Sequence, residues 1–163
     1  FQNRSAYEEQ GNGMKRWLLI ALGCIACAPL CMAQSTTAIR EFAEAFIAAE
    51  KAAWENGDFA ALEALEHPDV VFQNIDGTVY RGWEAHKKAI SAARVAFGGP
   101  ITQEWRYLMG EGNMFSVSYK WTIRAQGRTR QIVGMATGRV KDGKLIEEWG
   151  ASRTIEVKES DPR

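Results

Sequence analysis

The feature that most constrains the fold is a tight turn near the end of the chain, at Asp142-Gly143. Asp-Gly between two runs of strand-forming residues is a strong short-range signal for a β-hairpin, since both central residues of the favoured turn need positive φ. Two more turns with Gly precede it, at Gly110 to Asn113 and at Gln126-Gly127. The spacing predicts four antiparallel strands, at about 101–109, 114–124, 128–140 and 144–155.

The second of these predicted strands alternates between apolar and polar residues. Phe115, Val117, Tyr119, Trp121 and Ile123 fall on one face, and Ser116, Ser118, Lys120 and Thr122 fall on the other. A period of two indicates a sheet with one buried face and one face at least partly in water.

Helical patterns occupy the chain before this meander. Apolar residues recur at helical spacing from Ile39 to Trp54. Thr36-Thr37 is suited to cap this helix, and Asn56-Gly57 to stop it. The same reading predicts a short helix at 59–65, a strand pair at 70–72 and 78–80 around Asp76-Gly77, and a third helix at 83–97. We therefore expect an α+β fold.

The N-terminal part indicates export. Residues 1–13 are polar and precede a possible initiator at Met14, so we place them outside the fold. Residues 14–33 have the basic start, short apolar run and small residues of a secretory signal peptide, and the run is too short to span a bilayer. We expect cleavage after Ala33, a single domain at 34–163, and a periplasmic or secreted location. A less favoured alternative is a lipoprotein anchored through Cys24 or Cys27.

The charge balance argues against a nucleic-acid partner. The 163 residues contain 20 Lys+Arg and 20 Asp+Glu, a formal net charge of +0. Nucleic-acid binding calls for a basic stripe, and the chain has none. No third ligand accompanies His67 and His86 at metal-binding spacing, so we expect neither a metal site nor a cofactor.

The order of these elements resembles the nuclear transport factor 2-like superfamily, and its SnoaL-like branch in particular. The resemblance rests on Trp54 to Phe59, His67 to Phe72, Asp76-Gly77 with Tyr80 to Gly82, and Gly138 to Trp149. It implies a ketosteroid isomerase-like cone: a strongly curved, mostly antiparallel sheet wrapped around three helices, with a pocket at its open end. It also implies frequent homodimers through the outer sheet face.

Two residues are candidates for catalysis. His86 falls on the inward stripe of the third predicted helix, where it could act as a general base, and Tyr80 could donate a hydrogen bond. A packed histidine with one hydrogen bond is the simpler interpretation. Isomerases of the family resemble one another in a carboxylate base just before the first turn. Gln73 and Asn74 stand there instead, and an amide accepts no proton at neutral pH.

Aromatic residues dominate the expected ligand-binding set. We predict a pocket lined by Trp54, Phe72, Asn74, Trp105, Tyr107, Tyr119, Trp121 and Trp149. Such walls suit a flat ring compound, although the same side chains could simply form the core. The leading hypothesis is therefore a protein that binds a small hydrophobic or aromatic molecule. One alternative is a cyclase, isomerase or dehydratase that uses His86, and another is a homodimerising domain without a ligand.

Overall fold

The computed structural model describes residues 28–157, with side chains from Thr36 onward. Residues from Thr36 onward form one compact unit, separate from residues 1–35. The predicted leader at 1–13, and Cys24 and Cys27 of the predicted signal, lie outside the described residues. The described elements, in chain order, are α2 (Ala28–Lys51), the π-helical turn η1 (Ala52–Asn56), α3 (Ala60–Leu65), β1 (Glu66–Asn74), β2 (Val79–Arg81), α4 (Trp83–Phe97), β3 (Ile101–Glu111), β4 (Met114–Ala125), β5 (Arg128–Lys141) and β6 (Lys144–Val157).

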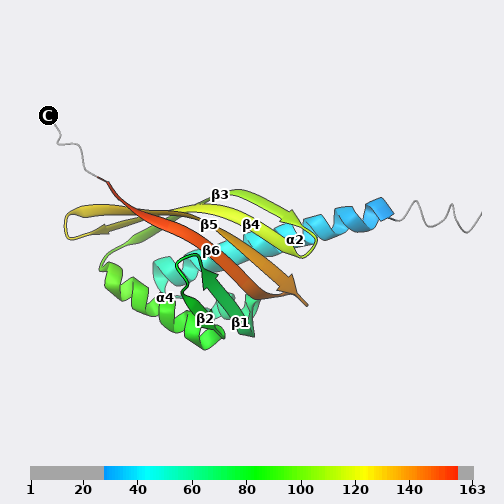
Figure 1. Cartoon of the computed structure of the whole chain (residues 1–163), viewed down its shortest axis with the longest axis horizontal. Helices are drawn as coiled ribbons and strands as arrows, with labels where there is room; N and C mark the ends of the chain where they lie inside the picture. The colour runs from blue at the N-terminus through cyan, green and yellow to red at the C-terminus, as the bar shows by residue number, and fades with distance from the viewer. Residues whose placement is uncertain (1–27, 158–163) are drawn as a thin grey trace, which may run out of the picture. The chain divides into compact units, whose positions relative to one another are not determined.

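The strands described here form a single six-stranded sheet in the order β2-β1-β6-β5-β4-β3. Neighbouring strands are antiparallel except β1 and β6, which run parallel. Figure 1 shows the four long strands β3 to β6 side by side, with β1 and β2 beyond β6. The prediction of an α+β fold with a mostly antiparallel sheet is confirmed, and the sheet stays open rather than closing into a barrel.

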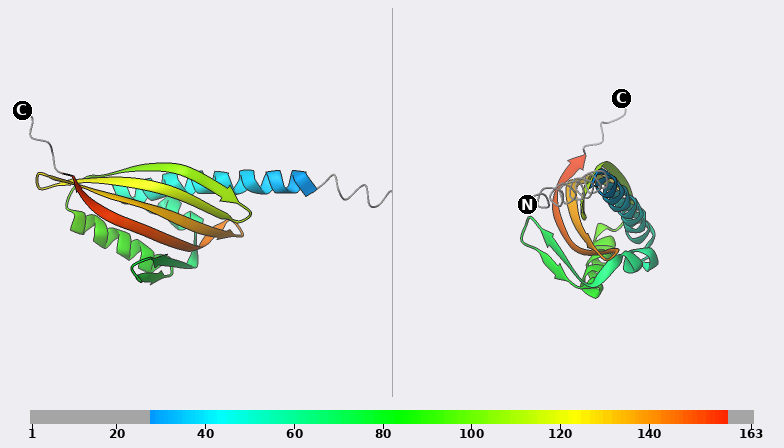
Figure 2. Two further views of the ribbon diagram at one scale, coloured as in Figure 1. Left: turned by 45° about the horizontal axis from the view of Figure 1, so that its top comes forward. Right: turned by 90° about the vertical axis from the view of Figure 1, so that its right-hand side faces the viewer.

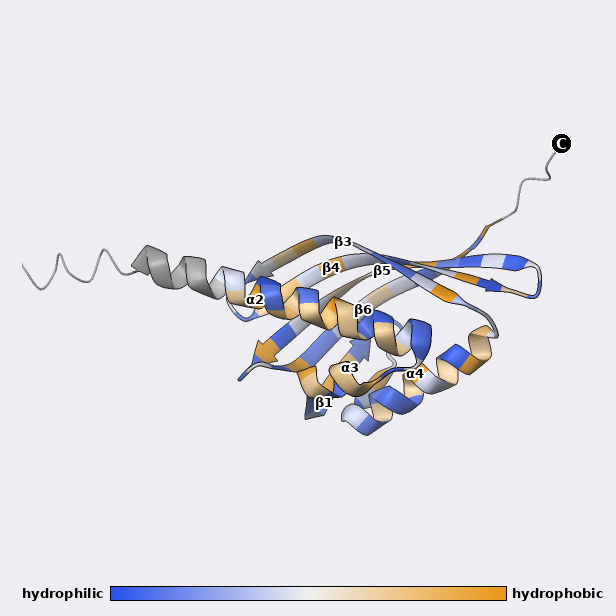
Figure 3. Ribbon diagram, turned by 180° about the vertical axis from the view of Figure 1, so that it is seen from behind, coloured by the Kyte–Doolittle hydropathy of each residue, from blue (hydrophilic) through white to orange (hydrophobic). Residues whose placement is uncertain are grey.

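The long strands curve around the helices. The end-on view in Figure 2 shows α2 and α4 on the concave side of the sheet. Phe46 from α2, Phe115 from β4 and Leu145 from β6 are almost fully buried there. Figure 3 shows hydrophobic residues interleaved with hydrophilic ones along the strands, as expected for a sheet with one covered face.

The hairpin turns form where the sequence predicts them. Asp142 and Gly143 have φ of 50° and 72°, and Gln126 and Gly127 have 53° and 68°. Positive φ at both central residues matches the twist of the strands that they join. The predicted meander follows from these turns.

Two predicted boundaries are wrong. The first helix begins at Ala28 rather than at Thr36-Thr37, so both threonines lie inside α2. The first strand begins at Glu66 rather than Val70, because Glu66 pairs with Leu145 of β6. A parallel partner 79 positions away leaves no local mark in the sequence, whereas Pro68 is an obvious breaker. In the described part of the chain, none of the helices is long and apolar enough to cross a membrane.

Candidate functional site

A cavity of about 210 Å³ lies between the concave face of the sheet and the helices. A single water needs roughly 15 Å³ on the same measure, so the cavity has room for a small organic molecule. Its walls are mainly aromatic and aliphatic, with polar side chains at several points. Eight of the ten residues singled out from the sequence line it: Trp54, Phe72, Asn74, Tyr80, His86, Trp105, Tyr119 and Trp121.

The two other predicted residues lie outside the cavity, because irregularities in β3 and β6 change which way they face. Tyr107 has φ of 53° at a register shift between Arg106 and Met109, and its side chain is 79% exposed. Trp149 follows a register shift at which Arg139 pairs with Glu147 and Val140 pairs with Leu145. It packs under the Arg139 guanidinium, 5.1 Å from its ring centroid. Simple alternation would have placed both side chains inward.

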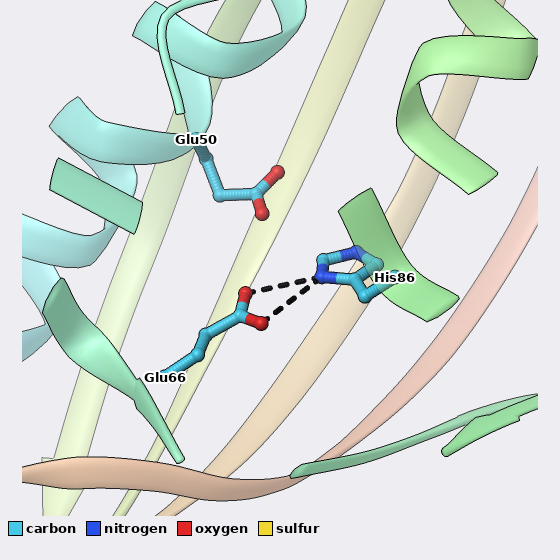
Figure 4. Close-up of side chains that lie close together, drawn as sticks. All are labelled: Glu50, Glu66 and His86. Carbon is cyan, nitrogen blue, oxygen red and sulfur yellow. Dashed lines mark hydrogen bonds and ion pairs between the residues drawn. The ribbon is translucent and has the colours of Figure 1, made fainter. Parts of the chain in front are cut away.

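Three ionisable side chains from three different elements meet beside the cavity. Glu50 comes from the end of α2, Glu66 from the start of β1 and His86 from the first turns of α4, and all three are buried. His86 Nδ1 lies 3.1 Å from Glu66 Oε1 and 3.3 Å from Oε2. Figure 4 shows the Glu50 carboxylate pointing toward this pair. Glu50 and His86 line the cavity, and Glu66 lies behind them.

Local sequence explains how each group is placed. Glu50 is four residues from both Phe46 and Trp54, so it shares their inward helix face. The Phe72 ring stacks on the His86 imidazole at a centroid distance of 3.6 Å. The π-helical turn after Glu50 ends at Gly57, with φ of 77°. Turns of this kind are rare and occur frequently at functional sites.

Burial controls the protonation of this cluster. Desolvation raises the pKa of Glu66 to about 9 and lowers the pKa of His86 to about 4. Desolvation also raises the pKa of Glu50 to about 7, against the opposing influence of His86. At neutral pH, therefore, Glu66 is a carboxylic acid that donates to Nδ1 of a neutral His86, and the ring proton lies on Nε2. Among the described residues, no partner bonds to Nε2.

A fourth acidic group, Glu148 of β6, lines the same cavity. Desolvation raises its pKa well above the ordinary value, and the nearby Glu50 and Glu66 raise it further. Within residues 36–157, no hydrogen bond or ion pair engages its carboxylate. On β4, burial raises the pKa of Tyr119 to about 12, although a hydrogen bond with Ser152 opposes the shift. Tyr119 is therefore a neutral phenol.

This arrangement is capable of acid–base chemistry, in which Glu50 changes protonation near neutral pH and His86 offers an N–H donor. It also offers a set of metal ligands. One ligand atom each from Glu50, Glu66 and His86 lies within 4.8 Å of the others, and carboxylate oxygen with imidazole nitrogen suits several divalent cations. The expectation that no metal binds was based on the lack of a third ligand near His67 and His86 and of known metal-binding motifs, and it stays a prediction.

Sequence reasoning missed Glu50, Glu66 and Glu148. It searched for a carboxylate just before the first turn, and the structure supplies carboxylates from α2, from the start of β1 and from β6 instead. The spacing of Glu50 from Phe46 and Trp54 was a usable signal, whereas Glu66 and Glu148 had none. Gln73 faces outward and donates to Glu147 at 3.0 Å. Asp76 accepts the Thr78 N–H at 2.9 Å in the turn.

Comparison with known proteins places this geometry in a family. A model of the SnoaL-like domain matches residues 43–148, which include Glu50, Glu66, His86 and Glu148. No curated protein matches the sequence.

Solved structures of similar fold include several enzymes. An LEH-like epoxide hydrolase from M. tuberculosis has a TM-score of 0.58 at 18% identity, covering 72% of this chain and 84% of that one. IdmH from Streptomyces antibioticus, a proposed polyketide cyclase, has a TM-score of 0.55 at 22% identity, and the match covers 65% of this chain and 88% of that one. A protein of ketosteroid isomerase-like fold from Catenulispora acidiphila, solved with trimethylamine, has a TM-score of 0.55 at 15% identity, and the match covers 64% of this chain and 82% of that one. Identities this low support the shared fold alone.

Proposed function

This chain belongs to the SnoaL-like domain family, and on that premise we propose that it binds a small ring compound in its cavity and catalyses proton transfer on it. Members of the family are often polyketide cyclases, isomerases or hydrolases. The observation that carries the proposal is the position of Glu50. Its carboxylate lies at an aromatic-walled cavity, beside a His86–Glu66 pair. The neighbour that holds trimethylamine supports small-molecule binding by this fold.

The chemistry follows from the protonation states. Ionised Glu50 removes a proton from a carbon next to a carbonyl group, and the electron pair of the broken C–H bond moves onto the carbonyl oxygen. The Nε2–H of His86 donates a hydrogen bond to that oxygen as its charge develops. In a substrate with a C=C bond next to that carbon, the oxygen electron pair then re-forms the carbonyl group and the double bond shifts toward it. The π electrons of the original C=C bond take up the proton that Glu50 returns to its far carbon. Glu66 acts as a positioning residue, since its bond to Nδ1 keeps the His86 proton on Nε2.

The pKa of Glu50 suits this role. A general base works best when its pKa is close to the working pH, and such a base contributes roughly 10²- to 10⁴-fold to rate. Burial raises the pKa of Glu50 to about 7. The pKa of His86, about 4, makes it a weak base and a better hydrogen-bond donor. The proposal therefore moves the base from His86 to Glu50.

The test uses 5-nitrobenzisoxazole, a small ring compound from which any well-placed base removes a carbon-bound proton. The N–O bond breaks in the same step, and the coloured nitrophenolate product is followed by absorbance. Turnover by the wild-type protein should rise with pH through about 7, because only ionised Glu50 accepts a proton. Glu50→Gln should lower the rate by about 10² or more.

Glu44→Gln is the matched control, since Glu44 lies on the same helix with 58% of its side chain exposed. Its rate should equal that of the wild type. The proposal fails if Glu50→Gln turns over the probe as fast as the wild type does, or if the wild type is no faster than acetate in solution.

Binding without chemistry is the second candidate function, and the aromatic lining favours it. Saturable quenching of tryptophan fluorescence by a ring compound, with no Glu50-dependent turnover, would support it.

Export directed by residues 14–33 and homodimerisation through the outer sheet face remain part of the proposal. The sequence pattern supports the first, and the exposed Met135 on β5 supports the second.

A further inference from the structure

The ionisable side chains around the cavity are acidic or neutral, and none of those described is basic at neutral pH. Glu50 and Glu148 line it, and Glu66 lies directly behind Glu50 and His86. The other ionisable groups that face it are His86 from α4, Tyr80 from β2 and Tyr119 from β4. Among the described lining residues there is neither Lys nor Arg. Nothing in the wall therefore offers a positive charge to these carboxylates at neutral pH, since His86 is neutral there.

Two arginines on strands and helices that border the cavity are engaged elsewhere. Arg139 pairs with Glu147 at 3.2 Å and lies over Trp149, on the face of the sheet away from the cavity. Arg94 donates from Nε to the Trp54 carbonyl at 2.9 Å, with its guanidinium against Gly57. Neither lines the cavity, so a positive charge would have to arrive with the ligand.

Part of the cavity wall is a row of aromatic rings. Trp105 and Tyr119 have centroids 5.3 Å apart, Tyr119 and Trp121 also 5.3 Å, and Trp121 and Trp54 4.5 Å. Aromatic faces attract cations through their quadrupole, and Trp does so most strongly. The same rings pack against apolar groups. A wall of this kind suits a molecule that has both a positive charge and an apolar ring.

We propose, building on the proposed function, that the natural ligand is an organic cation: a protonated or quaternary amine attached to an apolar ring, with its nitrogen held by Glu50 and Glu148. Buried carboxylates are costly unless they are paired. Glu50 accepts a side-chain hydrogen bond from Trp54, but among the described residues no positively charged side chain lines the cavity beside Glu50 or Glu148. An ammonium group supplies that charge, while the ring lies against the aromatic row. An anionic ligand would meet three acidic groups and is disfavoured.

The binding test compares two probes of matched shape, phenyltrimethylammonium and its neutral isostere tert-butylbenzene. At pH 8 the cation should bind about tenfold more tightly or better, measured by calorimetry or tryptophan fluorescence.

A variant pair locates the charge preference. Glu148→Gln should bind tert-butylbenzene as the wild type does, which shows that it is folded, and should lose most of the preference for the cation. Glu147→Gln is the control, since Glu147 lies on the same strand but is bound to Arg139 and Gln73 outside the cavity. It should keep the full preference.

The outcomes separate this inference from the function on which it rests. Equal binding of the two probes, or tighter binding of tert-butylbenzene, overturns the cationic ligand and leaves a ring-binding cavity in place. An undiminished preference in Glu148→Gln overturns the assignment to that carboxylate. Failure of both probes to bind overturns the inference and the proposed function together.

Discussion

Glu66 is an unusual residue for the place that it occupies. It starts a strand, it is 2% exposed, and its only bonded partner among the described residues is the neutral His86 ring. Charged carboxylates are almost never buried in this way, so the protein stabilises the protonated form. The cluster thereby keeps one proton between Glu66 and His86 and leaves Glu50 as the group that titrates near neutral pH.

This arrangement makes stability depend on pH. The folded-state pKa of Glu66 is about 9 against 4.5 for the free group, so the folded protein holds a proton that the unfolded chain loses between these values. Stability must then fall as pH rises through that window. The lowered pKa of His86, about 4 against 6.5, acts in the opposite direction but only below pH 6.5. Between pH 7 and 9, the carboxylates alone determine the trend.

We predict that Glu66→Gln flattens this decline. Gln cannot ionise, so the variant should lose less unfolding free energy than the wild type between pH 7 and 9. The difference is at most about 1.4 kcal/mol per pH unit for one proton. Urea unfolding at several pH values measures it, and Glu63→Gln, an exposed change on α3, should follow the wild type. Parallel curves for Glu66→Gln and the wild type would show that Glu66 is already ionised in the folded protein.

At the scale of the element, irregularities in the strands decide which residues reach the cavity. β6 places both Leu145 and Glu148 inward, three residues apart, because an extra residue is accommodated near Ile146. Such a bulge leaves one residue unpaired and reverses the faces beyond it. Glu148 gains access to the cavity by this shift.

Small residues on β5 make room for the side chains of β4. A Cβ at Gly138 would lie 2.5 Å from two ring atoms of Phe115 and 2.8 Å from Leu145 Cδ1. Both neighbours are almost fully buried, so they have little freedom to move. The close packing of the sheet on α2 therefore depends on glycine at this position.

We predict that Gly138→Ala destabilises the fold by about 1–3 kcal/mol, the usual cost of overpacking a core. Chemical denaturation measures the change. Val95→Ala is the control, because Val95 is 82% exposed on α4, and it should cost much less. An unchanged stability for Gly138→Ala would mean that the strands move apart at little cost.

At the scale of the whole molecule, the outer face of the sheet is the candidate for self-association. Ala136 is buried at the cavity, so its neighbour Met135 points to the outer face. Met109, 61% exposed, pairs with Ser116, whose neighbours Phe115 and Val117 are buried. These exposed apolar side chains agree with the homodimer that the family resemblance implies.

We predict a dimer at micromolar concentration in analytical ultracentrifugation. Met135→Lys should shift it toward monomer, since a charge in the core of an interface is costly. Val95→Lys should not, because Val95 is 82% exposed on α4 rather than on the sheet. A wild-type monomer throughout the micromolar range would contradict the expected association.

Local chemistry accounts for what the sequence by itself determined. The turns at Gln126-Gly127 and Asp142-Gly143, the alternation in β4 and the helical stripe of α4 arise from residues within a few positions of one another, so they can be read directly. The same logic brought eight of the ten predicted side chains to the cavity. It could not foresee the shifts in β3 and β6 that turn Tyr107 and Trp149 away. Nor could it foresee that Glu50, Glu66, His86 and Glu148, spread over four elements, share one buried site. Only the curvature of the sheet around the helices brings them together, and only their burial there gives them the protonation states on which the proposed chemistry depends.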